Sequence, residues 1–370
     1  MHSASMFSNI YQGKKILVTG HTGFKGSWLT TWLLQLGADV IGLSLDIPSN
    51  PAMFNVLELA AKIKHIQGDM RDLALVTEVL HTYKPDFVFH LAAQAIVSLS
   101  YQDPVGTMST NIVGTLHILE ALRSVDWPCA AVIITSDKCY DNVEWVWGYR
   151  ETDALGGKDI YSGSKAAAEM VIKSYYHSFF LQHPMVTLAV GRAGNVIGGG
   201  DWAKDRIVVD CMRAWSAGHA VEIRCPEATR PWQHVLEPLS GYLLLGQNLA
   251  QKKQHGEAFN FGPRAEQNRT VRELLHDIFQ HCSSFQLQNY YAEIDNIPFH
   301  EAGLLKLNCD KALFHLSWEP NLAYAETIRF TGEWYSAFYG KETDMYALTL
   351  QQINHYIQCA SERERIWVQQ

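Results

Sequence analysis

The stretch "KKILVTGHTGFKG", residues 14–26, carries the strongest indication of the fold. A short apolar run ends at Gly20, and Gly20, Gly23 and Gly26 follow with G-x-x-G-x-x-G spacing. The next segment, "SWLTTWLLQLG" (27–37), has apolar residues at helical spacing and ends at a glycine. A strand, a glycine-rich loop and a helix in this order are typical of a dinucleotide-binding unit, where backbone N–H groups approach a pyrophosphate. A turn that simply needs glycine is the alternative.

Two carboxylates follow at the places where such a unit contacts the rest of a dinucleotide. Asp46 ends the second predicted strand (39–46), 20 residues after Gly26. A carboxylate there accepts hydrogen bonds from the ribose of NAD and would repel the 2′-phosphate of NADP, so we expect NAD; a cap or turn is the alternative. Asp69 follows a third strand and either meets the adenine edge or caps the helix that begins near Asp72.

The first half of the chain alternates between strands and helices. Further strands are predicted at 85–94, 130–137 and 185–194, and helices at 72–83, 107–124 and 161–181. This alternation predicts an α/β fold with a Rossmann-type, doubly wound parallel sheet. After about residue 193 a glycine-rich loop begins, and helices at 204–217, 233–252 and 270–281 mix with short strands.

These patterns predict two domains. We expect an NAD-binding domain over 1–192, with a returning segment at about 233–262. A smaller α+β substrate domain would combine 193–232 and 263–340 and lie over the carboxyl edge of the sheet. The tail, 341–370, has no functional signature.

The composition excludes several classes of protein. The net charge is −8 and like charges do not cluster, which argues against a nucleic-acid partner. No apolar stretch is long enough to span a bilayer, and the N-terminus lacks the features of a secretory signal, so we expect no membrane partner. The seven scattered cysteines indicate reduced thiols and a cytoplasmic location. Cysteine and histidine spacing predicts no metal site.

A reactive group is indicated by "YSGSK", which places Tyr161 and Lys165 on one face of a helix. An ammonium close to a phenol lowers the phenol pKa and makes it a usable base near neutral pH. Ser136 ends a strand 25 residues upstream. Each feature alone has a structural explanation, an exposed helix face or a strand-end cap, but the three together form a constellation.

These residues resemble the extended short-chain dehydrogenase/reductase superfamily over nearly the whole chain. Five longer strings resemble the CDP-glucose 4,6-dehydratase family more specifically: "TGHTGFKG", "TSDKCYDN", "WGYRE", "RAGNVIGGGDWAKDR" and "RPWQHVLEPLSGYLLL". The resemblance implies conversion of CDP-glucose to CDP-4-keto-6-deoxyglucose for deoxysugar and surface polysaccharide synthesis. Oxidation at C4, loss of water across C5–C6 and return of hydride to C6 would regenerate a tightly held NAD in each turnover.

The resemblance also implies roles for individual residues. Tyr161 would remove the proton of the 4-hydroxyl, Lys165 would tune Tyr161 and hold the nicotinamide ribose, and Ser136 would bind the 4-oxygen. Asp137 would protonate the departing 6-hydroxyl. The remaining predicted cofactor contacts are Gly20, Thr22, Gly23, Phe24, Lys25, Gly26, Asp46, Asp69, Met70, Leu91, Ala92, Ala93, Gln94 and Asn111, and the predicted substrate contacts are Asn195, Arg206, Arg230 and His234.

Two positions depart from the pattern of relatives. Lys138 stands where dehydratases acting on dTDP-glucose or GDP-mannose have a glutamate base. Lys138 is a deprotonated base with a depressed pKa, an electrostatic stabiliser of a C5 enolate or a structural ion-pair partner; we favour a direct role. Ser98 replaces an arginine common in the family, which puts the exact sugar or nucleotide in doubt.

Other functions stay open at this point. A nucleotide-sugar 4-epimerase would need Ser136, Tyr161 and Lys165 but not Asp137 and Lys138, and a dehydratase for another NDP-hexose is a further alternative. A non-catalytic NAD-sensing protein would usually lack Tyr161 or Lys165. The resemblance implies a homodimer or homotetramer. Apolar residues of 107–124 and 161–181 are candidates for the interface and could equally belong to the core: Leu116, Leu119, Leu122, Val171, Tyr175 and Phe179.

Overall fold

The computed structural model describes residues 6–264, 266–294, 304–341 and 344–369. Residues 265 and 295–303 of the predicted substrate domain lie outside the described residues. The same holds for residues 1–5 of the predicted NAD-binding domain and for residues 342, 343 and 370 of the predicted tail.

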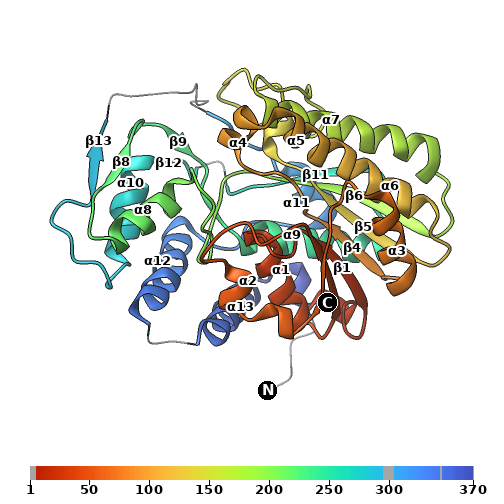
Figure 1. Ribbon diagram of the computed structural model, residues 1–370, viewed down its shortest axis with the longest axis horizontal. Helices are drawn as coiled ribbons and strands as arrows, with labels where there is room; N and C mark the ends of the chain where they lie inside the picture. Colours follow the sequence, from red (N-terminus) through yellow and green to blue (C-terminus); the bar gives the residue numbers. More distant parts are fainter. Residues whose placement is uncertain (1–5, 265, 295–303, 342–343, 370) are drawn as a thin grey trace.

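A parallel sheet of seven strands forms the centre of the molecule (Figure 1). The strands run in the order β11-β6-β5-β4-β1-β2-β3, and each neighbouring pair is parallel. They are β1 (Lys15–Thr19), β2 (Asp39–Ser44), β3 (Lys64–Gln67), β4 (Phe87–His90), β5 (Cys129–Ile134), β6 (Val186–Ala193) and β11 (Ala258–Phe261). The order reverses direction between β1 and β4, which is where open α/β sheets bind ligands beyond the carboxyl ends of the strands.

Helices cover both faces of this sheet, which confirms the predicted fold class. One face packs against α3 (Leu73–Tyr83), α6 (Gly114–Arg123) and α7 (Ile160–Tyr175), and the other against α1 (Phe24–Gln35) and α9 (Leu236–Ala250). Successive residues of β1 alternate between the two buried clusters, because neighbouring side chains of a strand point to opposite faces. Leu17 belongs to one cluster, and Ile16 and Val18 belong to the other.

Smaller elements gather at one end of the molecule, on the left of Figure 1. They are α8 (Ile207–Ser216), α10 (Val271–Gln280) and two small sheets, β8 (Val221–Ile223) with β13 (Tyr291–Glu293) and β9 (Thr229–Arg230) with β12 (Arg269–Thr270). The returning segment contributes the strand β11 to the large sheet and the helix α9, which packs on β5 and β6. The helix α11 (Asp310–Leu316) packs on β11 and α9. One continuous buried cluster joins both parts, so the domain boundaries stay a prediction.

The C-terminal tail packs against the core beside the N-terminal residues. After α12 (Tyr324–Gly340), α13 (Met345–Glu362) packs on α1 and α12, and α14 (Ile366–Gln369) follows. Trp367 stacks on Phe7 with ring centroids 5.1 Å apart. Tyr356 donates a hydrogen bond of 2.9 Å to the buried Glu237 carboxylate. The tail is therefore part of the packed structure of the sheet domain.

Short elements complete the described chain. They are η1 (Phe7–Asn9), α2 (Met53–Val56), η2 (Leu59–Ala61), α4 (Val97–Gln102), α5 (Pro104–Met108), η3 (Ser109–Val113), η4 (Asp137–Cys139), η5 (Tyr176–Phe180), β7 (Val196–Ile197) and β10 (Gln233–His234). Among the described helices, none combines the length and the apolar character needed to cross a bilayer.

Candidate active site

The glycine-rich loop joins β1 to α1, as its pattern predicts. Gly20 has φ +74°, and a Cβ there would lie 2.7 Å from the backbone nitrogen of Ala92. A Cβ on Gly26 would lie 2.1 Å from the carbonyl oxygen of Gly20. Both glycines are therefore required by close backbone approach, which brings the start of α1 against the ends of β1 and β4.

The loop presents its backbone donors at the helix start. Gly23 is the N-cap of α1 and makes no side-chain capping hydrogen bond, so the first-turn N–H groups of α1, which include Phe24 and Lys25, have no side-chain cap. The Thr22 hydroxyl donates to the Asp46 carbonyl oxygen at 2.6 Å. The predicted second strand is two residues too long, because β2 ends at Ser44 and Asp46 lies in the exposed turn beyond it. Asp46 is thus held beside the loop, in a place that suits contact with a ribose.

Asp69 lies at the same edge of the sheet but does not cap a helix. Asp72 is the N-cap of α3 and accepts a hydrogen bond of 3.1 Å from the Leu75 N–H, so the capping alternative for Asp69 is wrong. The Asp69 carboxylate instead pairs with Arg71 at 2.6 Å. Met70, between them, is buried in the core.

Asn111 connects the loop after β4 to the reacting helix. Its side chain accepts from the Gln94 N–H at 2.8 Å and donates to the Gln94 carbonyl oxygen at 3.0 Å. It also donates to the Ser164 hydroxyl at 2.8 Å. Asn111 lies in the π-helical turn η3, within a continuous helical segment that includes most of the predicted helix over 107–124. Leu91, Ala92 and Ala93 follow β4 as partly exposed residues between this contact and Gly20.

The polar residues after β5 form a compact turn. The Ser136 side chain accepts from the Lys138 N–H at 3.2 Å and donates to the Asp137 carboxylate at 3.0 Å. Asp137 is buried, and burial raises its carboxyl pKa while the nearby charge of Lys138 opposes that rise. Lys138 is partly exposed. The turn thus brings a hydroxyl, an acid with a raised pKa and an amine to the carboxyl end of β5.

Tyr161 and Lys165 of α7 face this turn and are both buried. Burial raises the pKa of Tyr161 to about 12, against a hydrogen bond with Ser136 and the charge of Arg206. Burial also lowers the pKa of Lys165 to about 8. The expected low pKa of Tyr161 is therefore wrong for the chain by itself, because burial disfavours the phenolate more strongly than nearby groups favour it.

Two further cations approach the same point. Burial lowers the pKa of Lys25 to about 8, and the charges that act on it include Arg206, Lys165 and Asp137. Arg206 is held by Asp201, with 2.5 Å between Nη1 and Oδ2. Lys25, predicted as a cofactor contact, therefore also lies within electrostatic range of the reacting residues. Asp201 was not predicted from the sequence.

The other predicted substrate residues lie in different environments. Asn195 is partly exposed between β6 and β7, and Arg230 is partly exposed in β9. His234 is 0% exposed and lies between the rings of Trp28 and Phe330, with centroids 5.7 and 5.5 Å away. Its predicted direct contact with substrate is therefore wrong for this arrangement, because the pairing of β10 with β7 places the imidazole in the core.

Ser98, one of the two residues that depart from the pattern of relatives, contacts the segment that follows β7. Its hydroxyl donates to the carboxylate of Asp205, which has φ +60° and directly precedes Arg206. The contact joins α4 to the segment that carries Arg206. Although Ser98 is shorter than arginine and uncharged, its side chain is thus still hydrogen bonded to that segment.

A buried ion pair that was not predicted lies behind the turn. Arg192 and Glu169 are joined by two hydrogen bonds, of 2.7 and 2.8 Å. Glu169 lies one helical turn after Lys165, and this spacing was the only sequence signal. No short pattern connects Glu169 with Arg192.

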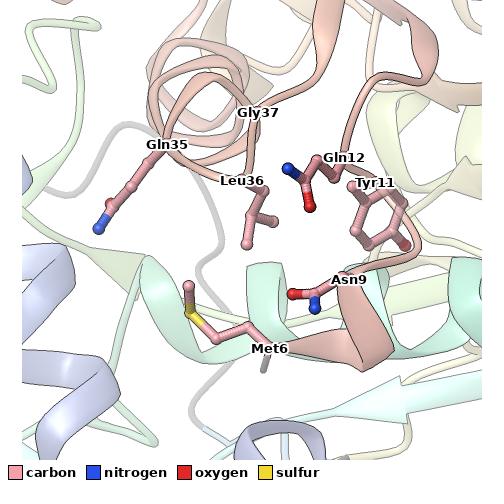
Figure 2. A pocket seen from close by; sticks show the side chains of 7 residues that line it. All are labelled: Met6, Asn9, Tyr11, Gln12, Gln35, Leu36 and Gly37. Atoms are coloured by element: carbon pink, nitrogen blue, oxygen red, sulfur yellow. The ribbon is translucent and has the colours of Figure 1, made fainter. Parts of the chain in front are cut away.

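The cavity shown in Figure 2 lies elsewhere. It has a volume of about 200 Å³ and is lined by Met6, Asn9, Tyr11, Gln12, Gln35, Leu36 and Gly37. These residues surround the start of β1 and the end of α1, at the opposite edge of the sheet from the reacting residues. Within the described part of the chain, no group of three or more His, Cys, Asp or Glu side chains could hold a metal ion.

Comparison with known proteins agrees with this geometry. Residues 17–331 match the family model described as GDP-mannose 4,6 dehydratase. The chain is 45% identical over 354 residues to the CDP-glucose 4,6-dehydratase of Salmonella typhimurium, which covers 94% of this chain and 98% of that protein. It is 26% identical to the CDP-paratose 2-epimerase of Salmonella typhi, over 87% of this chain and 99% of the relative.

Solved structures show the same fold. A dTDP-glucose 4,6-dehydratase from Streptomyces venezuelae, with NAD and TYD bound, superposes with a TM-score of 0.75 at 21% identity and covers 90% of this chain and 99% of its own. A UDP-glucose 4-epimerase from Thermotoga maritima gives 0.74 at 24% identity, over 88% and 99%. The resemblance drawn from the sequence is confirmed: this chain belongs to the NAD-dependent epimerase/dehydratase family and, within it, to the CDP-glucose 4,6-dehydratases.

Proposed function

We propose that the protein converts CDP-glucose to CDP-4-keto-6-deoxyglucose and regenerates NAD in each turnover. The observation that carries this proposal is the meeting of Ser136, Asp137, Tyr161 and Lys165 beside the glycine-rich loop. The 45% identity to a CDP-glucose 4,6-dehydratase supports the choice of nucleotide.

The loop suits NAD on structural grounds. The close approach of Gly20 to Ala92 leaves no side chain between the loop and β4, and α1 begins without a side-chain cap. Donors at a helix start bind a pyrophosphate, and the Asp46 carboxylate suits an unphosphorylated ribose. The chemistry that NAD would supply when bound is acceptance of hydride from C4 and its return to C6 as a proton returns to C5, and the positive charge of NAD would favour an ionised Tyr161.

Tyr161 and Ser136 would act at C4. Tyr161 takes the proton of the 4-hydroxyl as the C4 ketone forms, while Ser136 donates a hydrogen bond to the 4-oxygen. The phenol pKa is about 12 in the chain alone, although the charge of Arg206 already lowers it. The further charge that favours the phenolate would therefore come from bound NAD.

Asp137 would act at C6. The new C4 ketone acidifies the C5 proton, and elimination then requires a proton for the departing hydroxyl. Asp137 is suited to give that proton because burial raises its carboxyl pKa and so favours the protonated form. Its place next to Ser136 would let the two side chains act at C4 and C6 of the same sugar.

Lys138 would act at C5. It lies in the same turn as Asp137 and is partly exposed. As a neutral amine it would accept the C5 proton, and as a cation it would stabilise the enolate while another group moves the proton. Both roles place it at the step that separates dehydration from simple oxidation.

The substrate diphosphate would lie against the second domain. Arg206 and Arg230 offer charge-assisted hydrogen bonds to a diphosphate, and the partly exposed Asn195 offers an amide. His234 is not included, because it is buried between aromatic rings.

Epimerisation at C4 is the second candidate, because a solved UDP-glucose 4-epimerase shares the fold. An epimerase has no use for Asp137 and Lys138, whereas this chain places both next to Ser136. The product decides: a 4-keto-6-deoxy sugar absorbs ultraviolet light in alkali and shows the mass of water lost. An isomer of unchanged mass would contradict the proposed function.

A homodimer through α6 and α7 is also proposed. Leu119 and Leu122 are wrong as interface candidates because they are buried in the core, and Val171 and Tyr175 are partly buried against it. The exposed apolar side chains beside them are Val105, Val113, Met170 and Phe179. Sedimentation of the wild type and of Met170→Glu would test this, since only an interface residue would shift the mass toward the monomer.

A further inference from the structure

The turn that carries Ser136, Asp137 and Lys138 is attached at both ends to one buried ion pair. Thr135 directly precedes the turn, and its hydroxyl donates to the Glu169 carboxylate at 2.5 Å. Tyr140 directly follows it, and its phenol oxygen accepts from Arg192 Nη1 at 2.7 Å. The two ends of the turn thus contact opposite members of the same pair.

The pair itself has the geometry of a rigid support. Arg192 Nε and Nη2 donate to the two Glu169 carboxylate oxygens at 2.7 and 2.8 Å. The side chains are each 4% exposed, so water does not compete for these contacts. A planar guanidinium on a carboxylate fixes orientation as well as distance.

Glu169 connects this support to the reacting helix. Tyr161, Lys165 and Glu169 are spaced four residues apart on α7, which places them along one face of the helix. A movement of the turn relative to α7 would therefore break the contact of Thr135 with Glu169 or the contact of Tyr140 with Arg192. Because the turn is held at two points, it cannot rotate about one of them.

Arg192 connects the same support to the sheet. It lies in β6, opposite Asn260 of β11 in the strand register. The Tyr140 hydroxyl donates to the Asn260 side-chain oxygen at 2.7 Å, and Asn260 in turn donates to the Tyr149 carbonyl oxygen at 2.9 Å. The support thus rests on two strands of the sheet, β6 and β11, and on the helix α7.

We propose that Glu169 and Arg192 are positioning residues that set the distance between the Ser136–Asp137–Lys138 turn and the Tyr161–Lys165 pair. Neither residue is among those proposed to contact the substrate. They act through Thr135 and Tyr140, which hold the turn at both ends. This inference rests on the proposed function, because it assigns a purpose to the spacing of groups that act at C4, C5 and C6 of one sugar.

Packing alone does not explain the pair. A buried ion pair is often no more stabilising than apolar side chains of the same volume, because both charges lose their water. Apolar residues would fill the space but could not orient Thr135 and Tyr140. A positioning role therefore predicts a loss of activity beyond the loss of stability, whereas a packing role predicts a loss of stability only.

The first test removes each attachment without disturbing the charges. Thr135→Val and Tyr140→Phe each delete one hydroxyl and keep the shape of the side chain. We expect kcat with CDP-glucose to fall on the order of 10- to 100-fold in each, since small displacements of reacting groups have effects of that size. KM and the bound NAD content should stay within about two-fold, because no substrate contact changes.

Matched controls delete the same hydroxyls elsewhere. Thr331→Val removes a buried hydroxyl that donates to Thr327 at 2.8 Å, and Tyr11→Phe removes one that donates to Leu243 at 2.5 Å. Neither residue is near the reacting groups. Both controls should match Thr135→Val and Tyr140→Phe in the loss of melting temperature but keep the wild-type kcat.

The second test replaces the pair itself. The double variant with Glu169→Leu and Arg192→Met removes both charges together, so that neither is left buried alone. We expect a folded protein by circular dichroism with a kcat reduced at least as much as in Thr135→Val. If Thr135→Val and Tyr140→Phe both keep kcat within two-fold of their controls, Glu169 and Arg192 are structural only and the inference is wrong.

The two failures are distinguishable. If the wild type releases no water from CDP-glucose, the proposed function fails before any variant is compared. If the wild type turns over and only the variants are unaffected, the proposed function stands and the positioning role falls.

Discussion

The side chain of Asn111 is hydrogen bonded to both backbone groups of Gln94, accepting from its N–H at 2.8 Å and donating to its carbonyl oxygen at 3.0 Å. The same amide nitrogen donates to the Ser164 hydroxyl, which in turn donates to the Tyr161 carbonyl oxygen at 2.6 Å. One buried amide therefore joins the loop after β4, where the cofactor is expected, to the first turn of the reacting helix. Its position in a π-helical turn aims it at this junction.

Asn111→Ala should reduce both stability and kcat. The substitution removes the side-chain partners of the partly buried N–H and C=O groups of Gln94, which costs up to about 1–3 kcal/mol for each group. Loss of the link to Ser164 should lower kcat by roughly ten-fold, through misplacement of Tyr161. Melting temperature and steady-state kinetics measure the two effects, with Asn248→Ala on α9 as a control that removes a single hydrogen bond to Leu244. Equal kinetics in the two variants would contradict a role for Asn111 in the site.

Ser98→Ala should weaken substrate binding more than it slows chemistry. The Ser98 hydroxyl contacts the Asp205 carboxylate next to Arg206, which is proposed to bind the diphosphate. We expect KM for CDP-glucose to rise roughly three- to ten-fold while kcat stays within two-fold, because the lost interaction is uniform across the reaction. Asp205→Asn, which keeps an acceptor for Ser98, is the matched variant and should behave like the wild type. A KM unchanged by Ser98→Ala would show that the contact does not matter for binding.

Lys138→Met should abolish exchange of the C5 proton with deuterated solvent. Oxidation at C4 should still occur, since Ser136 and Tyr161 are untouched, and transient reduced cofactor would show it by absorbance. Lys138→Arg separates the two chemical roles, because arginine keeps the charge but does not lose its proton near neutral pH. Exchange that persists in Lys138→Arg favours electrostatic stabilisation, and exchange that is lost favours proton transfer. Unchanged exchange in Lys138→Met would remove Lys138 from the chemistry.

Glu237 should make stability depend on pH. Burial raises its carboxyl pKa from 4.5 to about 7, although the backbone N–H groups of Leu322 and Asn321 and the hydroxyl of Tyr356 oppose the rise. The pKa of Glu237 is higher in the folded state than in the unfolded state. The stabilisation of the folded state by the protonated carboxyl is therefore fully present below pH 4.5 and is lost as the pH rises through about 7. The difference amounts to up to about 3 kcal/mol.

Urea unfolding at a series of pH values checks the expected dependence. The free energy of unfolding of the wild type, relative to that of Glu237→Gln, should fall between pH 5 and 8. A constant difference between the two proteins over this range would mean that Glu237 has an ordinary pKa.

Much of the fold could be predicted because its signals are local. The glycine spacing from Gly20 to Gly26 and the alternation of apolar strands with helices each lie within short segments. Errors appear where a boundary depends on a distant partner. The strand that was expected to reach Asp46 ends at Ser44, whose hydroxyl instead accepts from the Thr22 N–H at 3.3 Å.

The same difference between local signals and distant contacts explains which site residues could be predicted. Tyr161 and Lys165 were found because helical spacing places them together. His234 was assigned wrongly, and Leu119 could not be divided between interface and core, because which face of an element is buried depends on what packs against it in the folded chain. Glu169 and Arg192 are 23 residues apart on a helix and a strand, so only the three-dimensional structure pairs them.

The most direct test of the account is mass analysis after incubation with CDP-glucose, dTDP-glucose, UDP-glucose and GDP-mannose in parallel. We predict that CDP-glucose loses one water without added NAD, and that the other three nucleotide sugars lose water much more slowly or not at all. Ultraviolet absorbance of the product in alkali should confirm the 4-keto group. Loss of water from another nucleotide sugar in preference would contradict the assignment of the substrate, and no loss from any of the four would contradict the dehydratase function itself.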